Sequence, residues 1–234
     1  MNGNPAPDGV SSVLDPSDPA YAGQATYTPS FLAHVYDPLV LRFNNRWVWR
    51  CTSTALTRHY DSHVSAAHLD VGPGTAYYLD RCQFPVSAPE ITLLDPNGAV
   101  LAASSARLHR YSPRVHQASV LEPIGLPTAS FDSIGLGHVL HCLPGTMESK
   151  TRAIANLRPL LRPGGQIFGS TVLAAGVRHT VLSRRVMSSL NHRGIFHNLD
   201  DDLMSLHRTL EAHLTNVEIR IQGTVALFAG RAST

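Results

Sequence analysis

Short apolar runs alternate with amphipathic stretches along most of the chain. Five such runs have the length and composition of buried strands, at about residues 67–71, 90–95, 114–121, 129–137 and 165–168. Between them, apolar residues recur every three or four positions and predict helices at about 76–81, 96–111 and 147–161. Strands that alternate with helices are typical of a parallel sheet that is covered by helices.

The last strands differ from this series. Residues 217–221 and 224–229 are two further apolar runs, separated only by a short turn at Gln222-Gly223, which predicts an antiparallel hairpin. We therefore expect an α/β fold, a three-layer sandwich with a seven-stranded, mostly parallel sheet and an antiparallel C-terminal strand.

Segments outside the strand–helix series have their own patterns. Residues 1–26 are rich in Pro, Gly, Ser and Asp without a hydrophobic period, which predicts a flexible arm before a single domain at 27–234. Residues 27–66 predict helices that break near Asp37-Pro38, because a residue before proline is disfavoured in helical conformation. Residues 173–214 predict a helical insert after the fifth strand.

Composition narrows the class of protein. The 234 residues, 43% of them hydrophobic, suffice for one domain with a real core, and a net charge of +2 from scattered basic residues argues against a nucleic-acid partner. The three cysteines lack C-x-x-C spacing and the thirteen histidines lack H-x-x-x-H spacing, so no metal site is predicted. With no leader and no run of about 18 apolar residues, we expect a cytoplasmic protein without a membrane partner.

The stretch from His68 to Ala76 is the most informative. A strand carrying Asp70 is followed by Gly72 and Gly74, where the absence of a Cβ lets the backbone approach a nucleotide-like ligand. A dinucleotide fingerprint would need a third glycine where Tyr77 stands, and an ordinary strand-to-helix turn explains the glycines equally well. Asp95 ends the next strand 21 residues after Gly74, where a carboxylate can accept from both hydroxyls of a ribose.

Two later motifs complete an ordered set. Phe131-Asp132 opens a strand that leads to His138 and His141, and Leu161-Arg162-Pro163-Gly164-Gly165 ends a helix before the fifth strand. With the glycine turn and Asp95, these motifs make residues 67–230 resemble the class I S-adenosylmethionine-dependent methyltransferases. The resemblance implies a Rossmann-like fold and S-adenosylmethionine as cofactor.

The resemblance also implies which residues bind the cofactor: Tyr36, Asp70, Gly72, Gly74, Asp95, Pro96, Ser119, Val120 and His138. The chain departs from the family at Ser119, where relatives often carry an acid for the adenine amino group, and at Ala76, where they often carry a third glycine. Ser119 can accept a hydrogen bond but brings no charge, so weaker cofactor binding is expected there.

Histidines at the end of the fourth strand are the candidate catalytic residues, because ligands of open α/β sheets bind outside the carboxyl ends of strands. Imidazole can take a proton near neutral pH, which makes His141 the candidate base and His138 a second candidate; capping or packing is the alternative for His141. For the acceptor we expect contacts from Tyr27, Trp47, His141, Met187, Asn191, Phe196 and His197, unless the aromatic residues only fasten the helices to the sheet.

The expected activity is methyl transfer from S-adenosylmethionine to a small, largely apolar, natural-product type molecule, preferably to oxygen. The alternative is a protein that keeps the fold without methylating, either as a cofactor-binding scaffold or as a catalyst of another reaction such as cyclisation. The N-terminal aromatic helices suit a lid or a dimer surface, so a homodimer is left open.

Overall fold

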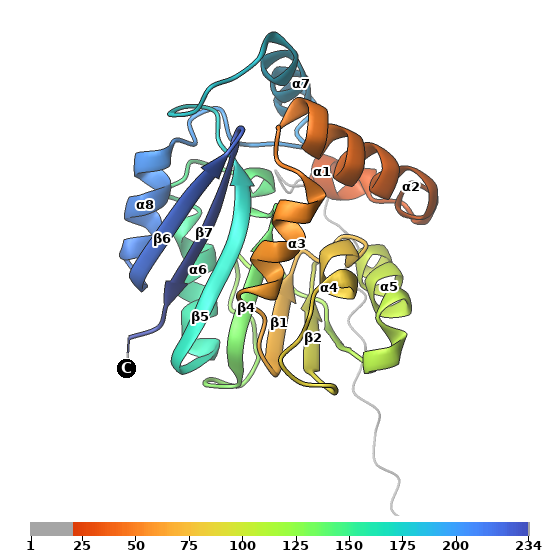
Figure 1. Cartoon of the computed structure of the whole chain (residues 1–234), viewed down its shortest axis with the longest axis vertical. Helices are drawn as coiled ribbons and strands as arrows, with labels where there is room; N and C mark the ends of the chain where they lie inside the picture. Colours follow the sequence, from red (N-terminus) through yellow and green to blue (C-terminus); the bar gives the residue numbers. More distant parts are fainter. Residues whose placement is uncertain (1–20, 234) are drawn as a thin grey trace, which may run out of the picture.

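A single seven-stranded sheet organises the protein (Figure 1). The computed structural model describes residues 21–233, and its strands follow the order β3-β2-β1-β4-β5-β7-β6. β1 to β5 pair in parallel, and β7 runs antiparallel to both of its neighbours, β5 and β6, as predicted for the C-terminal hairpin. The strands are β1 Ala67–Val71, β2 Glu90–Leu94, β3 Arg114–His116, β4 Phe131–Gly137, β5 Leu161–Val172, β6 Thr215–Gln222 and β7 Val225–Arg231.

Helices cover both faces of this sheet, which confirms the three-layer prediction. The helices with α labels are α1 Tyr21–Thr26, α2 Pro29–Phe31, α3 Ser53–Asp61, α4 Tyr77–Arg81, α5 Gly98–Arg107, α6 Thr151–Leu157, α7 Val181–His192 and α8 Leu203–Glu211. The others are the π-helix η1 Leu32–Val48 and the short 3-10 turns η2 His109–Tyr111, η3 Leu140–Cys142 and η4 Arg158–Leu160.

Two apolar cores lie on either side of the sheet. Ile167 of β5 belongs to the core under α6 and α8, whereas its neighbour Phe168 belongs to the core under η1, α3, α4 and α5. This division follows from the strand geometry, in which successive side chains point to opposite faces. The sheet is therefore buried on both sides, as expected for parallel strands.

The N-terminal region departs from the prediction in two places. Most of the predicted arm lies outside the described residues, but Tyr21–Thr26 form helix α1, which is fixed because Asn97 donates from Nδ2 to the Gln24 carbonyl oxygen at 2.9 Å. The expected break at Pro38 is wrong, since η1 continues through it. Asp37 fastens this part of η1 by accepting hydrogen bonds from Thr75 at 2.5 Å and from Arg107 at 2.7 Å.

The third strand is shorter than expected. Only Arg114–His116 pair with β2, because the chain then leaves the sheet in a turn closed by the Glu122 amide, which donates to the Ser119 carbonyl oxygen at 3.2 Å. The residues after β3 are consequently free to form a wall of the cavity described below.

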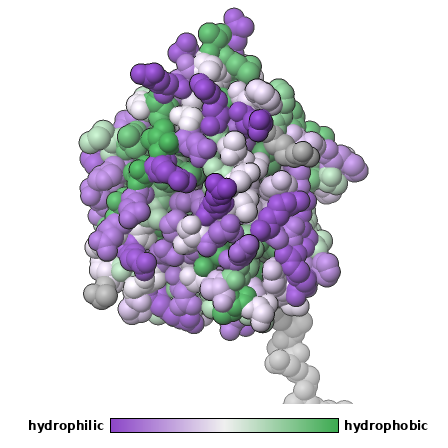
Figure 2. All heavy atoms as spheres, viewed as in Figure 1, coloured by the Kyte–Doolittle hydropathy of each residue, from purple (hydrophilic) through white to green (hydrophobic). Residues whose placement is uncertain are grey.

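The surface mixes polar and apolar residues on the face shown in Figure 2. On η1, four apolar side chains are exposed at four-residue spacing: Val35, Leu39, Phe43 and Trp47. None of the helices in the described residues has the length and apolar character that crossing a bilayer requires.

Candidate functional site

A cavity of about 350 Å³ lies outside the carboxyl ends of β1, β2 and β4. The glycine turn after β1 forms its base, and the ends of β2 and β4 form two of its sides. Helix α1 contributes Gln24, the loop after it contributes Tyr27, η1 contributes Tyr36, and Ile195 contributes from the insert. The predicted edge of the sheet therefore carries an enclosed space of the size of a small-molecule site.

The glycine turn holds the backbone close to its surroundings. Gly72 and Gly74 have φ values of 61° and 56°, which is the left-handed region that glycine adopts without strain. A Cβ on Gly72 would lie 2.7 Å from Cγ2 of Val139, and one on Gly74 would lie 2.8 Å from the Tyr36 hydroxyl oxygen. No other residue type fits these two positions without a shift of the neighbours.

Asp95 follows β2 at the cavity wall, as predicted. One carboxylate oxygen accepts from the Asn97 amide at 2.8 Å, which is the hydrogen bond that favours the charged form. Burial outweighs this bond and raises the pKa of Asp95 to about 7. A ligand that donates hydrogen bonds to this carboxylate would therefore stabilise its charged form.

Asp70, an expected cofactor contact, is not among the residues that line this cavity. Its carboxylate is buried, accepts from the Tyr60 hydroxyl at 3.2 Å and lies 3.7 Å from Nε2 of His68. A Cβ on Gly135 of β4 would lie 2.6 Å from the same carboxylate, so Gly135 makes room for it. Asp70 belongs to a polar cluster behind the glycine turn, and it supports the site from there.

The loop after β3 forms the side expected for the adenine ring. Ser119 and Val120 line the cavity together with Gln117 and Pro96. The Ser119 hydroxyl accepts from the Leu121 amide at 3.2 Å, and Asn156 of α6 donates to the Val120 carbonyl oxygen at 3.0 Å. These bonds fix the backbone of the loop, although none of the described residues that line this side, Gln117 to Leu121, carries a carboxylate.

His138 lies at the end of β4 and lines the cavity, as predicted. Its backbone has a φ of 62°, and its amide donates to the Ser170 carbonyl oxygen at 2.9 Å. Both ring nitrogens are buried without a hydrogen-bond partner among the described residues. Burial lowers the pKa of His138 to about 4, so the ring is neutral at pH 7.

His141 lies behind His138 instead of on the cavity wall. Its Nδ1 accepts from the Val172 amide at 3.2 Å, so this nitrogen carries no proton. The centroids of the His141 and His138 rings are 5.5 Å apart, and the Phe196 ring lies 4.3 Å from His141 on the other side. The structure thus favours the packing alternative for His141.

Of the other predicted acceptor contacts, only Tyr27 lines the cavity. Trp47 is 59% exposed on η1, because its side chain points to solvent. The remaining four are held by protein neighbours away from the wall: Met187, Asn191, Phe196 and His197.

Gln24 and Ile195 are among the cavity residues that the sequence did not indicate. Gln24 lay in a segment without a hydrophobic period, so nothing marked it. Ile195 directly precedes the predicted Phe196, and only the fold decides which of the two reaches the cavity.

Comparisons with known proteins agree with this geometry. A family model described as a methyltransferase domain matches residues 69–167. Demethylluteothin O-methyltransferase of Streptomyces thioluteus is 38% identical over 88% of this chain and 89% of its own length. The physcion biosynthesis cluster O-methyltransferase of Aspergillus chevalieri is 34% identical over 90% of this chain and 95% of its own length.

A solved structure supports the fold. The N-methyltransferase NodS of Bradyrhizobium japonicum WM9, crystallised with S-adenosylhomocysteine, superposes with a TM-score of 0.62 and 18% identity over 93% of this chain and 100% of its own. The sheet order, the glycine turn at the end of β1 and the extent of the matches to relatives lead to one conclusion: the chain belongs to the class I S-adenosylmethionine-dependent methyltransferases.

Proposed function

We propose that this enzyme transfers the methyl group of S-adenosylmethionine to a hydroxyl oxygen of a small, largely apolar molecule. The observation that carries the proposal is His138, a neutral imidazole beside the cavity whose ring nitrogens have no partner in residues 21–233. A hydroxyl proton of the acceptor would satisfy one of them. The two relatives described above are named as O-methyltransferases, which supports oxygen as the acceptor atom.

The cavity residues fit S-adenosylmethionine. A buried carboxylate with one backbone donor, Asp95, suits a pair of ribose hydroxyls, because a carboxylate can accept two further hydrogen bonds. The glycine turn leaves room that any Cβ would fill. We assign the ribose to Asp95 and Pro96, the adenine to Ser119 and Val120, and the methionine part to the turn at Gly72 and Gly74.

Tyr36 is assigned to cover the cofactor from η1. Its hydroxyl lies against Gly74, and its ring contacts the Tyr27 ring at a centroid distance of 5.6 Å. Burial raises the pKa of Tyr36 well above its ordinary value, so the phenol stays neutral. A neutral aromatic ring next to the turn suits a sulfonium, because its π face attracts cations.

The mechanism asks three things of the protein. S-adenosylmethionine supplies an electrophilic methyl group on a positively charged sulfur. The chain must align the acceptor oxygen, exclude water and accept the hydroxyl proton as that oxygen forms its new bond. Tyr27, Ile195 and the end of β4 enclose the space, and a ring nitrogen of His138 takes the proton. Because burial disfavours the imidazolium, we expect this proton to move together with methyl transfer.

A transfer assay with methyl-labelled S-adenosylmethionine and a panel of small phenols, carboxylic acids and amines tests the proposal. We expect labelled methyl ethers or esters and one equivalent of S-adenosylhomocysteine per product. Labelled amines without labelled oxygen products would move the reaction to nitrogen. Cofactor binding without transfer would favour the scaffold, and an acceptor rearranged without release of S-adenosylhomocysteine would favour another reaction such as cyclisation.

A further inference from the structure

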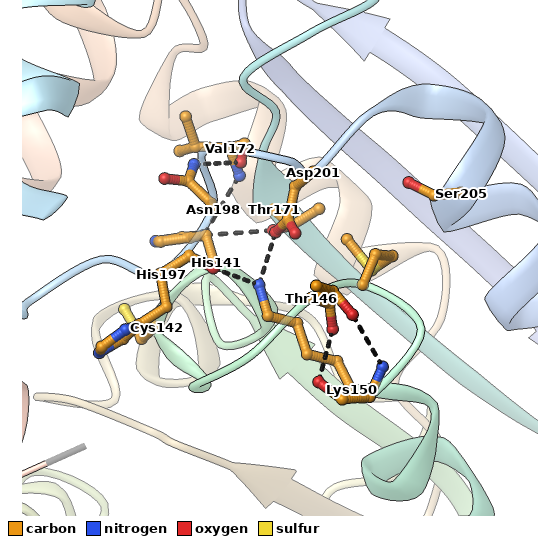
Figure 3. Close-up of polar contacts among 12 residues, drawn as sticks. His141, Cys142, Thr146, Lys150, Thr171, Val172, His197, Asn198, Asp201 and Ser205 are labelled. Atoms are coloured by element: carbon orange, nitrogen blue, oxygen red, sulfur yellow. Dashed lines mark hydrogen bonds and ion pairs between the residues drawn. The ribbon is translucent and has the colours of Figure 1, made fainter. Parts of the chain in front are cut away.

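One buried ion pair lies outside the cavity and takes no part in the mechanism described above. Lys150 directly precedes α6, and its side chain is 0% exposed. Its ammonium donates to Oδ2 of Asp201 and to the carbonyl oxygen of His197, at 2.7 Å each. Figure 3 shows the Lys150 side chain extended toward the two residues, with dashed lines from its ammonium to both acceptors.

The ammonium holds a segment that contributes to the cavity. We call residues 195–201 the roof segment. It begins at Ile195, which lines the cavity, and ends at Asp201, whose carbonyl oxygen accepts from the Ala174 amide at 2.9 Å. In its middle, the His197 amide donates to the His141 carbonyl oxygen at 2.8 Å. The roof segment therefore joins the cavity wall, the turn that carries His141 and the chain just after β5.

Side chains continue this connection to the reacting end of the cavity. Phe196 packs on His141 with ring centroids 4.3 Å apart, and His141 packs on His138 with centroids 5.5 Å apart. Asn198 adds a bond from Nδ2 to the Val172 carbonyl oxygen at 2.8 Å. Movement of the roof segment would thus shift Ile195 directly. It would also shift His138, because Phe196 packs on His141 and His141 packs on His138.

Stability alone is a weak reason for this pair. Removing two charges from water is costly, and an apolar pair of similar volume often serves a core as well or better. Burial lowers the pKa of Lys150 and raises that of Asp201, which reflects this cost. Hydrogen bonds from one ammonium to both a carboxylate and a carbonyl oxygen are directional, so they fix the position of the roof segment. Apolar contacts would allow this segment several positions.

We infer that Lys150 is a positioning residue of the methyl transfer, which fixes the roof segment and, through it, Ile195 and the His138–His141 pair at the acceptor end of the cavity. The inference rests on the proposed function. The expected effect concerns the acceptor end of the cavity and leaves the cofactor end unchanged, because no described contact of Lys150 involves the glycine turn, Asp95 or the loop at Ser119.

The test is the double variant Lys150→Met/Asp201→Val, which removes both charges without leaving one of them unpaired. We expect the acceptor KM to rise by about tenfold or more, since small misplacements in a site are expensive. The Kd for S-adenosylmethionine should stay within about twofold, because the cofactor end keeps its contacts. The control is Arg162→Met, which removes an exposed ion pair with Asp132 (2.9 Å) and should change neither value.

Hydrogen exchange of the protein without ligand gives a second readout, independent of activity. In the double variant the His197 amide should exchange about tenfold faster or more, while amides of β1 exchange as in wild type. An unchanged His197 amide, or an unchanged acceptor KM in a folded double variant, would overturn the inference. If the wild type transferred no methyl group, the proposed function would fail while the exchange rates still decided the role of Lys150. If the double variant does not fold, Lys150→Gln replaces it. The acceptor KM, the cofactor Kd and the exchange of the His197 amide are then measured in Lys150→Gln, and the same results support or overturn the inference.

Discussion

The hydroxyl group of Tyr36 lies directly over Gly74, so close that a Cβ atom on the glycine would stand 2.8 Å from the phenol oxygen. This contact joins η1 to the glycine turn after β1. It explains why a glycine is needed at position 74: the turn must present its backbone both to the cavity and to an aromatic ring above it.

Gly74→Ala should weaken cofactor binding. The new methyl group would displace Tyr36 from the turn and would sit at a φ of 56°, which costs about 1 kcal/mol in itself. Gly164→Ala is the matched control, because Gly164 has a φ of 76° and open space around its Cβ position. Calorimetric titration should show a Kd for S-adenosylmethionine raised about tenfold in Gly74→Ala, as expected for roughly 1.4 kcal/mol. Equal losses of affinity in both variants would contradict the role of the contact between Gly74 and Tyr36.

Cofactor affinity should depend on pH through Asp95. With a pKa of about 7, the carboxyl group is mostly protonated at pH 6 and mostly ionised at pH 8. Only the ionised form accepts from two hydroxyls, so the Kd should be about tenfold higher at pH 6 than at pH 8.

The control for this profile is Asp95→Asn, which keeps all other titrating groups, including those of the ligand. We expect weaker binding in this variant and a flatter pH profile between pH 6 and 8. Parallel profiles for wild type and Asp95→Asn would rule out Asp95 as the group that titrates.

His138→Asn should slow turnover without loss of cofactor binding. Asparagine tolerates the positive φ of this position, so the backbone is preserved, but its amide cannot take a proton. Loss of a general base costs about 10²–10⁴ in kcat. A wild-type kcat in His138→Asn would remove His138 from the mechanism.

His141→Gln, in contrast, should mainly lower the free energy of unfolding, because His141 is enclosed by Val172, Thr171 and Phe196.

Acid should destabilise the fold through His59. Its Nε2 donates to the carbonyl oxygens of Gly169 and Phe228 at 3.0 and 3.1 Å, and burial lowers its pKa to about 4. The unfolded chain therefore binds a proton that the folded chain does not between about pH 6.5 and pH 4, so stability falls as pH is lowered through this window.

Denaturant titrations at several pH values measure this effect. His59→Gln keeps a donor for the two carbonyl oxygens but does not titrate, so the slope of unfolding free energy against pH should fall by about 1 kcal/mol per pH unit in this window. His109→Gln changes an exposed histidine and serves as the control. Identical slopes for wild type and His59→Gln would contradict the role of His59.

The sequence allowed the sheet and one end of the site to be predicted. Asp95 lies where a strand end and its distance from Gly74 placed it, because the carboxyl ends of neighbouring parallel strands share one edge. The strand pattern also explains why Asp70 does not line this cavity. Leu69 and Val71 enter the same core, so the alternation along β1 turns Asp70 to the other face.

Other features depended on tertiary contacts that no local pattern contains. Pro38 stays inside a helix because Asp37 is held by Thr75 and Arg107, residues far away in the sequence. His141 was predicted at the right edge of the sheet, but the turn η3 places it behind His138. The edge of the sheet at which a residue lies was therefore predictable from the sequence, whereas the direction of its side chain in an irregular turn was not.

Calorimetric titration of the wild-type protein with S-adenosylmethionine at pH 8, repeated with Asp95→Ala, tests the central claim most directly. The account predicts one cofactor per chain in the wild type, and an affinity at least about tenfold lower in an Asp95→Ala protein that unfolds at a similar temperature. An absence of binding heat in the wild type, or equal affinities of the two proteins, would contradict it.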